Sequence, residues 1–467
     1  MWHTDHPGTP SQVFGATVLH LSHQIFFQRN ESFVISVLKN PENYMRILVV
    51  VGAALNAIIL FILGLSFFKI GVTPLFAISG QVFCALSPAV IMHSFGRFAA
   101  EPLLFFFSLA SCIFWVYAFR ENPVSVEVKA GKRETSILLA VVFSLVFSGF
   151  ACGVKITAFP LILLGIFTLR TITQKVIGVS VFVAAFFLAT VVTAPWRNFL
   201  VFFGKLLTHK GRYGGGERGW VDIKIYVANM LNLLAVNWVF SLTLILLLIS
   251  LVFSKLILAK VHRQLLGGSF AAMATSLLVV GKHPAPHYLI PGMVIAGVSL
   301  ALLASKVTVS FAQFRKQIVP VVMGCLVCLT ILFLAFSLSE ANDRRKEHVE
   351  GQVKSEIARQ SYDNKNLITV FLAGSGCTEQ GLYLGNSWAW YTYRKQLSEI
   401  YPNTLFFPFG ATTLSGFDGE EQARLLLSSK KKLLLIGDSI PPSNLYSNLF
   451  RREKNFYKNS HWLMRDQ

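Results

Sequence analysis

The chain has 467 residues, of which 54% are hydrophobic and only 14% are charged. Soluble globular proteins carry about 25% charged residues, so this chain has too few charges to cover a surface that faces water. The composition therefore excludes a disordered, collagen-like or ordinary cytosolic protein. Apolar runs of roughly 18 residues or more recur along the chain, which predicts a polytopic α-helical membrane protein.

The formal net charge is +19. In a soluble protein such a charge would suggest nucleic-acid binding. Here the basic residues lie mainly in loops between apolar runs. Membrane topology and contact with anionic membrane lipid explain this distribution, so we expect membrane lipid as a partner and no nucleic acid.

The N-terminal region, residues 1–45, is polar, and its residues 11–40 mix apolar with polar side chains. This mixture predicts amphipathic helices in the outer membrane interface. Ten apolar segments follow within 46–338, each close to the roughly 20 residues with which a helix crosses about 30 Å of hydrocarbon. The segments are 46–70, 72–92, 98–119, 135–152, 156–172, 176–194, 237–258, 265–281, 288–305 and 318–338.

The distribution of Lys and Arg predicts the orientation of these segments. If the N-terminus faces outside, the inside loops hold thirteen Lys and Arg residues and the short outside turns only three, Arg97, Lys155 and Lys282. With ten spans, both termini then lie outside. No signal sequence is visible, so we expect that a first span precedes Met1 and that the chain is a truncated version.

Two further regions are polar, the large outer loop 195–236 and the C-terminal region 339–467. The C-terminal region alternates short β-like runs with helical stretches, which predicts a small soluble α/β domain with a parallel sheet on the outer face. The expected strands are Leu367–Ala373, Thr404–Phe407 and Lys432–Ile436, and the expected helices lie near 381–399 and 418–429.

Polar residues at the outer face of the membrane are candidates for a functional site, because a charge beside lipid is costly. The first cluster, residues 3–10, holds Asp5 and His6 in a rigid Pro- and Gly-containing turn, or in a loop where they are incidental. The second holds Arg97 and Glu101, which are either an i,i+4 ion pair or a general acid/base and a substrate anchor. We weigh these two interpretations evenly.

Lys155 lies in a tight outer turn, where it either reaches the lipid headgroups or binds the phosphate of a lipid-linked substrate, and we favour the second. Lys282, His287 and Tyr288 lie in a Pro-rich turn between two spans, where phosphate and sugar binding competes evenly with a bent turn.

The loop 195–236 combines glycines with cations and aromatic residues, including Arg197, Arg212 and Trp220. Arg side chains suit phosphate and Trp side chains stack on sugars or mark the interface, so a mobile lid over a polar substrate is favoured over an unstructured loop. All five clusters lie on one side of the membrane in the predicted topology. Such a site suits a lipid-linked phosphosugar.

Three stretches resemble the GT-C-fold glycosyltransferases, specifically the group related to protein O-mannosyltransferases and bacterial lipid A aminoarabinose transferases. His6–Pro10 resembles the family's His/Lys-Pro-Pro-Leu turn in the first outer loop, with Gly8 in place of the second Pro. Gly149–Thr157 resembles its Gly-Leu-Ala-x-Leu-Thr-Lys turn, and His287–Pro291 resembles the Arg-Tyr-Leu-Leu-Pro start of a late span. Glu101 lies where the family carries an acidic residue before a span, and the pieces fit over about residues 1–340.

The resemblance implies an inverting transfer of a sugar from a polyprenyl phosphate to a glycan, lipid or protein acceptor. The family's general base is an Asp that precedes the His-Pro turn, and this chain begins at that turn, so Asp5 is the acidic residue left nearby. The roles expected are catalysis by Asp5 and Glu101, donor-phosphate binding by Lys155, Arg212, Lys282, His287 and Tyr288, and substrate binding by His6, Arg97, Arg197 and Trp220.

The resemblance also implies a multi-pass protein of a bacterial inner membrane, with its site facing the periplasm. Two alternatives to a membrane glycosyltransferase remain open, a transporter or flippase of lipid-linked sugars and a catalytically dead, truncated relative. The sequence has no metal-ligand spacing, so we assign no metal ligands and leave the cofactor, including a divalent metal, open.

Overall fold

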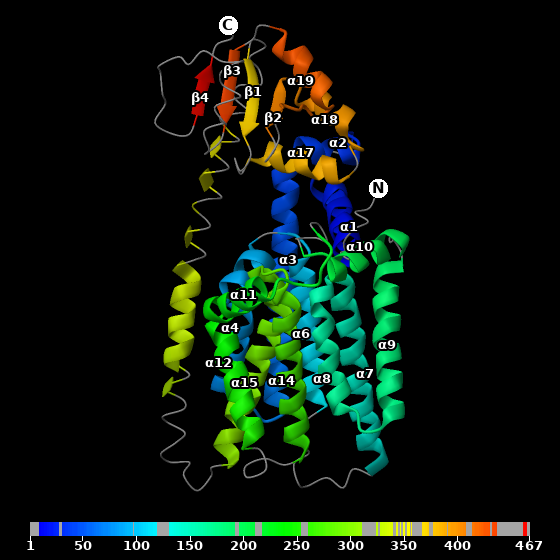
Figure 1. Ribbon diagram of the computed structural model, residues 1–467, viewed down its shortest axis with the longest axis vertical. Coiled ribbons are helices and arrows are strands. Elements are labelled where there is room, and N and C mark those ends of the chain that lie inside the picture. The colour runs from blue at the N-terminus through cyan, green and yellow to red at the C-terminus, as the bar shows by residue number, and fades with distance from the viewer. Residues whose placement is uncertain are drawn as a thin grey trace. The chain divides into compact units, whose positions relative to one another are not determined.

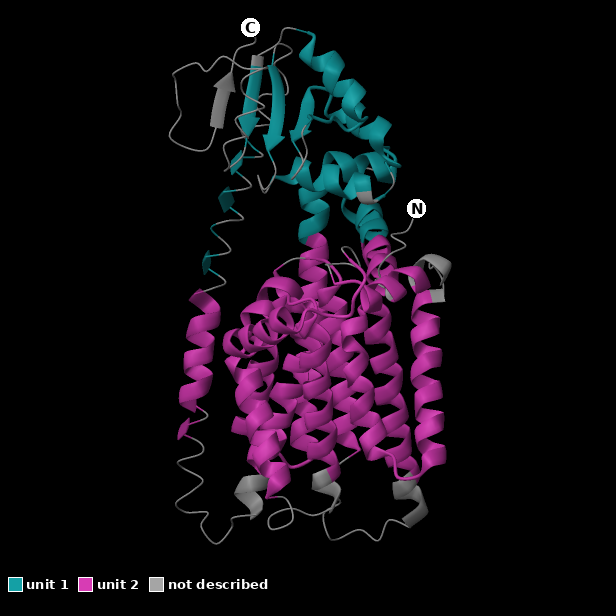
Figure 2. Cartoon of the chain, viewed as in Figure 1, with its two compact units in different colours: residues 1–3, 19–46, 342–467 teal, residues 4–18, 47–341 magenta. Residues whose placement is uncertain are grey.

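The computed structural model describes residues 9–310 except for 28–29, 97, 119–129, 192–195, 211–216 and 254–259. Beyond residue 310 it describes 324–325, 327–339, scattered residues between 342 and 356, and then 367–372, 377–389, 391–407, 413–429, 432–436 and 461–464. The chain divides into two compact units, coloured separately in Figure 2. The larger unit is Thr4–Val18 with Ile47–Ala341, and the smaller is Met1–His3 with Leu19–Arg46 and Asn342–Gln467.

The larger unit is a helical bundle, whose helices run side by side in Figure 1. Apolar runs form helices here because the interior of a bundle has no water to bond the backbone, and a helix satisfies its own N–H and C=O groups. The helices that begin or lie in this part of the chain are α1 (Thr9–Phe26), α3 (Pro41–Lys69), α4 (Pro74–Ala85), α5 (Pro88–Val90), η1 (Ile91–Phe95), α6 (Glu101–Tyr117), α7 (Ala130–Val154), η2 (Ile156–Leu161), α8 (Ile162–Thr168), α9 (Ile172–Val191), α10 (Trp196–Thr208), α11 (Ile223–Val236), α12 (Trp238–Val252), α14 (Lys260–Gly281), η4 (Pro286–Leu289) and α15 (Ile290–Ser310).

Five of the described helices are long and apolar enough to cross a membrane, and two bent helix pairs raise the number to seven. The five are α3, α7, α9, α14 and α15, and the bent pairs join α4 to Pro88–Phe95 and α11 to α12. Three shorter apolar helices, Glu101–Tyr117, Ile156–Thr168 and Val327–Ser339, coincide with the remaining predicted spans. Each of the ten predicted segments therefore contains an apolar helix, as a multi-pass membrane protein requires.

The large outer loop predicted at 195–236 contains two helices, α10 and α11, so much of it has regular structure. Asp222 begins α11 as its N-cap, because its Oδ1 accepts hydrogen bonds from the backbone N–H groups of Lys224 and Ile225. The helix pair α11–α12 bends by 99° at Asn237.

Helix α15 is the most deeply buried of the candidate spans. In its apolar stretch, within Pro286–Ser305, 94% of the residues are buried. It packs closely on α4 through small residues. A Cβ added at Gly297 would lie 2.7 Å from the backbone nitrogen of Cys84 and 2.8 Å from the carbonyl oxygen of Gly80. Side chains larger than hydrogen at this position would separate the two helices, as is typical of membrane helix pairs that meet at glycine.

The smaller unit holds a four-stranded sheet of order β2-β1-β3-β4. β1 (Leu367–Leu372) pairs in parallel with β2 (Thr404–Phe407) and β3 (Lys432–Ile436), as predicted. β4 (His461–Met464) adds an antiparallel edge strand that the sequence interpretation missed. The connecting helices are α17 (Thr378–Trp388), α18 (Arg394–Ile400) and α19 (Glu420–Leu427).

The N-terminal segment 19–46 belongs to this smaller unit. Leu38, in α2 (Phe33–Lys39), lies in one buried cluster with Phe371 of β1 and Phe406 of β2. The Tyr401 hydroxyl donates to the Leu38 carbonyl at 3.0 Å, and the Thr378 hydroxyl donates to Glu42 Oε1 at 2.7 Å. The two ends of the chain thus build one domain.

Tyr44 organises the polar interior of this N-terminal segment. Its hydroxyl lies 2.8 Å from His23 Nδ1 and 2.9 Å from Ser36 Oγ, and its ring stacks on Phe27 at 4.1 Å. We expect Tyr44→Phe to lower the free energy of unfolding of the smaller unit by about 1–2 kcal/mol, because two buried polar groups lose their partner. Hydrogen exchange of the β1 amides in the full chain measures this change.

The matched control is Tyr391→Phe, because the Tyr391 side chain is exposed. It should leave exchange at β1 unchanged. Equal exchange in wild type and Tyr44→Phe would contradict the structural role of the Tyr44 hydroxyl.

Candidate functional site

Four segments, from three regions that lie far apart in the sequence, meet at one end of the bundle. They are η1, the first residue of α6, the turn between α7 and η2, and η4. Their side chains form one cluster, defined here as the Glu101 cluster: His93, Glu101, Lys155, His287 and Tyr288.

Local sequence explains the turn that carries His93. Ser87 Oγ accepts a hydrogen bond from the Val90 amide, and Pro88 begins a new helical turn, so the chain bends by 59° after α4. The next turn, η1, is a π-helix, a form that often marks functional sites. The Asn56 side chain donates to the Ser94 carbonyl at 2.9 Å and ties this turn to α3.

Lys155 is held at its place by the end of α7. The helix stops at Val154, and Lys155 has an extended backbone. A Cβ on Gly153 would lie 2.6 Å from Ala189 Cβ, so glycine allows α9 to approach α7 closely at this point. Gly153 therefore has a packing role in the Gly149–Thr157 stretch, two residues before Lys155.

The Glu101 carboxylate and the Lys155 ammonium form a buried ion pair. Lys155 Nζ donates to Glu101 Oε1 at 2.5 Å, and the two side chains are 16% and 5% exposed, with Glu101 the more buried. A carboxylate without a partner would be very unfavourable at this depth, so the lysine is the group that allows a carboxylate here. The i,i+4 partner considered for Glu101, Arg97, lies outside the described residues.

Imidazole and phenol rings surround this pair. His287 Nε2 lies 3.8 Å from Glu101 Oε1, and the Tyr288 ring lies 4.4 Å from Lys155 Nζ, where it makes a cation–π contact. His287 also stacks on His93, with ring centroids 4.5 Å apart and an angle of 29°. The cluster therefore combines one carboxylate, one amino group and two imidazoles that can carry or transfer a proton.

The comparisons with known proteins were made against family models, curated proteins and solved structures. They found no match. The chemistry of the cluster is therefore the basis for any functional proposal.

The structure brings together four of the predicted site residues, Glu101, Lys155, His287 and Tyr288. His93 joins them although it was not predicted. The signal available in the sequence was a histidine in an apolar run, six residues after a Ser-Pro break and eight residues before Glu101.

Lys282 has a different environment from the other predicted phosphate ligands. Its Nζ donates to the carbonyl oxygens of Leu206 and Leu207 at 2.5 and 3.0 Å, and so binds the last turn of α10. Partial burial lowers the pKa of Lys282 from its usual value. A cation at a helix C-terminus stabilises the helix, so this contact holds α10 on the bundle.

The remaining predicted residues stay predictions. Asp5, His6, Arg97 and Arg212 lie outside the described residues. Arg197 lies in α10 by its backbone, and Trp220 is exposed in the turn that precedes α11. Within the described part of the chain, no group of three or more His, Cys, Asp or Glu side chains is arranged to hold a metal ion.

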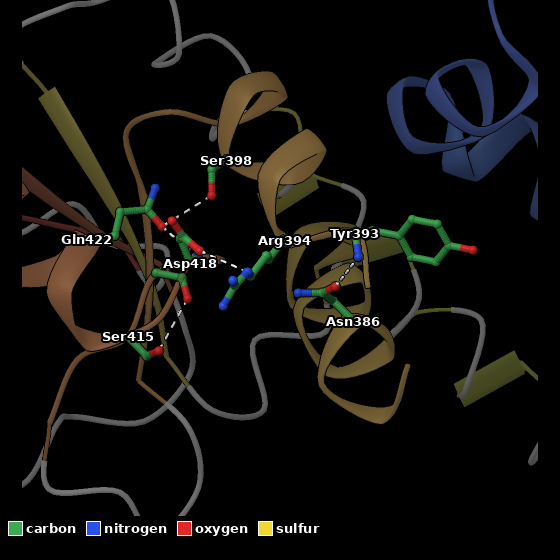
Figure 3. Close-up of polar contacts among 8 residues, drawn as sticks. Asn386, Tyr393, Arg394, Ser398, Ser415, Asp418 and Gln422 are labelled. Atoms are coloured by element: carbon green, nitrogen blue, oxygen red, sulfur yellow. Dashed lines mark hydrogen bonds and ion pairs between the residues drawn. The ribbon is translucent and has the colours of Figure 1, made fainter. Parts of the chain in front are cut away.

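The smaller unit has a polar network of its own (Figure 3). Gln422 Oε1 accepts from the Asp418 amide at 2.9 Å, and Arg394 Nε lies 3.4 Å from Asp418 Oδ1. Both charged side chains are more than half exposed. This network joins α18 to α19 at a solvated surface, and such pairs contribute little to stability or chemistry.

Proposed function

We propose that this chain is a membrane glycosyltransferase, which transfers a sugar from a polyprenyl phosphate to an acceptor on the outer face of the membrane. The outer face would be the periplasmic side of a bacterial inner membrane. The observation that carries the proposal is the convergence of Glu101, Lys155 and His287, from three separate segments, at one end of a bundle of apolar helices.

The two basic side chains are the proposed ligands of the donor phosphate. Lys155 and His287 are 16% and 23% exposed, and both are more accessible than Glu101. An anion that approaches the cluster therefore meets the Lys155 and His287 side chains before the carboxylate. Cations at this position stabilise the negative charge that the phosphate gains when it leaves.

In the proposed reaction an acceptor hydroxyl oxygen attacks the anomeric carbon of the sugar. The bond between that carbon and the phosphate oxygen breaks, and the phosphate takes the electron pair. The hydroxyl proton passes to a general base, for which Asp5 stays our prediction. Glu101 acts mainly on Lys155, because its oxygen holds the ammonium 2.5 Å away. We therefore assign Glu101 as a positioning residue, and the Tyr288 ring as the opposite wall of the lysine site.

The proposal is tested with the protein reconstituted in vesicles that contain polyprenyl phosphates carrying radiolabelled sugars. We expect time-dependent loss of label from the lipid in wild type. Lys155→Gln and His287→Gln should each lower this rate by about 100-fold, because each removes a cation from the leaving phosphate.

Lys69→Gln is the matched control. A Cβ added at Gly52 of α3 would lie 3.5 Å from Pro102 Cβ, next to Glu101, and Lys69 ends α3 17 residues after Gly52. At about 1.5 Å per residue this places Lys69 near the other end of the bundle, and its rate should equal that of wild type. Full release in both variants would remove Lys155 and His287 from the mechanism. Movement of the labelled lipid between leaflets without loss of sugar would favour the transporter alternative.

A further inference from the structure

The surface formed by α10, the turn before α11 and the first turn of α11 exposes large apolar side chains. Leu200 and Leu207 of α10 are 63% and 59% exposed, and Trp220 and Ile223 are 75% and 74% exposed. A protein surface in water seldom exposes such side chains together. This surface, residues 200–225 as far as they are described, is called the α10–α11 surface below.

The charges on the α10–α11 surface are mainly positive. Lys205, Lys210, Arg218 and Lys224 are exposed cations. The described residues of this surface include two carboxylates, and each makes a contact within the segment itself. Asp222 caps α11, and Glu217 lies 4.0 Å from Lys210. The surface therefore presents exposed cations beside exposed apolar side chains, the combination with which helices bind anionic lipid surfaces.

Three polar contacts fix this surface at the end of a membrane-length helix. Lys282 Nζ binds the carbonyls of Leu206 and Leu207, the Tyr226 hydroxyl donates to the Leu278 carbonyl at 2.7 Å, and the Asn229 side chain donates to the Gly281 carbonyl at 3.1 Å. The apolar stretch of α14 is Gln264–Gly281, so α10 and α11 are attached where it ends. This is the depth at which lipid headgroups lie and at which Trp and Lys side chains are enriched.

We propose that the α10–α11 surface binds the headgroup layer of anionic phospholipid. Trp220, Ile223, Leu200 and Leu207 enter the boundary between headgroups and acyl chains, and Lys205, Lys210, Arg218 and Lys224 contact lipid phosphates. The inference is independent of the proposed glycosyl transfer, because it concerns the host membrane and none of the Glu101 cluster.

The test is a fluorescence-quenching measurement on the full chain in vesicles of phosphatidylcholine with about one-fifth phosphatidylglycerol, which supplies the anionic headgroups. Bromine, which quenches tryptophan, is placed high on the acyl chains either of the phosphatidylglycerol or of an equal amount of phosphatidylcholine. The emission of Trp220 is the difference between wild type and Trp220→Phe. We expect brominated phosphatidylglycerol to quench this emission about twice as strongly as brominated phosphatidylcholine, because the cations enrich anionic lipid around it.

The variant Lys205→Gln/Lys210→Gln/Arg218→Gln/Lys224→Gln should bring this ratio close to one. The control Lys69→Gln/Arg170→Gln/Lys175→Gln removes three cations outside the α10–α11 surface and should leave the ratio near two. Equal quenching by both lipids in wild type would overturn the preference for anionic lipid. Absence of quenching by either lipid would overturn the contact with the membrane itself, and would show that water or another partner covers the surface.

Discussion

Replacement of Glu101 by leucine should lower the free energy of unfolding of the protein by about 3–5 kcal/mol and abolish most sugar release. The substitution removes the carboxylate that lies 2.5 Å from Lys155 Nζ, and it leaves a largely buried ammonium without this charge partner. Loss of one member of a buried ion pair is among the most destabilising single changes. Chemical unfolding in detergent micelles, followed by tryptophan fluorescence, measures the change.

Two further variants complete a thermodynamic cycle on this pair. Lys155→Met alone should destabilise the protein by a similar amount, whereas Glu101→Leu/Lys155→Met should recover much of the stability, since no buried charge remains. The double variant should still release sugar about 100-fold more slowly than wild type if Lys155 binds the donor phosphate. A loss below about 1 kcal/mol for Glu101→Leu, the size found for solvated pairs, would contradict the buried pair described here.

Replacement of Gly297 by alanine should lower the free energy of unfolding by about 3 kcal/mol. The new methyl group would approach the Cys84 nitrogen and the Gly80 oxygen to less than 3 Å. Both atoms belong to the backbone of α4, so neither can rotate away, and the whole helix must shift. The expected value therefore lies at the upper end of the usual cost of overpacking a core. Thermal unfolding in detergent provides the measurement.

Gly204→Ala is the control for this substitution. Gly204 also lies in a helix, but apart from its chain neighbours and the nearby backbone of its own helix, no described atom lies within 4 Å of the position of an added Cβ. Alanine there should leave stability unchanged or raise it by up to about 1 kcal/mol, because glycine loses more backbone entropy on folding. If both glycine variants behaved alike, the close contact of α4 with α15 would not limit stability.

The three predicted strands of the C-terminal region could be located nearly to the residue because each is a short, largely apolar run bounded by polar, glycine or proline residues. Predicted Leu367–Ala373 is observed as Leu367–Leu372, and the other two predicted strands have the observed bounds. The predicted helix near 381–399 is two helices, α17 and α18. Tyr391, at φ 57°, lies between them, and tyrosine is not a residue type that signals such a turn.

Four residues of the Glu101 cluster could be picked out from the sequence because a charge or a Pro-rich turn in an apolar context gives a local signal. Glu101 and Lys155 stand out as charged residues at the ends of apolar runs, and His287 and Tyr288 lie in a Pro-rich turn. His93 gave a weaker signal, because one histidine in an apolar run is more often a packed core residue. Its stacking on His287 depends on the π-helical turn, which no local pattern predicts.

Lys282 shows the limit of reasoning from residue type. Its charge and position in the sequence fit a phosphate ligand. In the structure its Nζ donates to the carbonyls of Leu206 and Leu207, which lie 76 and 75 residues earlier in the chain. Only the three-dimensional packing of α10 reveals this contact. The docking of the segment 19–46 on the C-terminal strands was unpredictable for the same reason.

Because both ends of the chain fold into one domain, the number of membrane crossings between them is restricted. Leu19–Arg46 and Asn342–Gln467 fold as one unit, so both must be delivered to the same compartment. The intervening polypeptide must then cross the bilayer an even number of times, as the ten spans predicted from the sequence would do. During synthesis, roughly 300 residues separate the segment 19–46 from the strands on which it packs. At 5–20 residues per second, the segment is therefore made about 15–60 s before those strands.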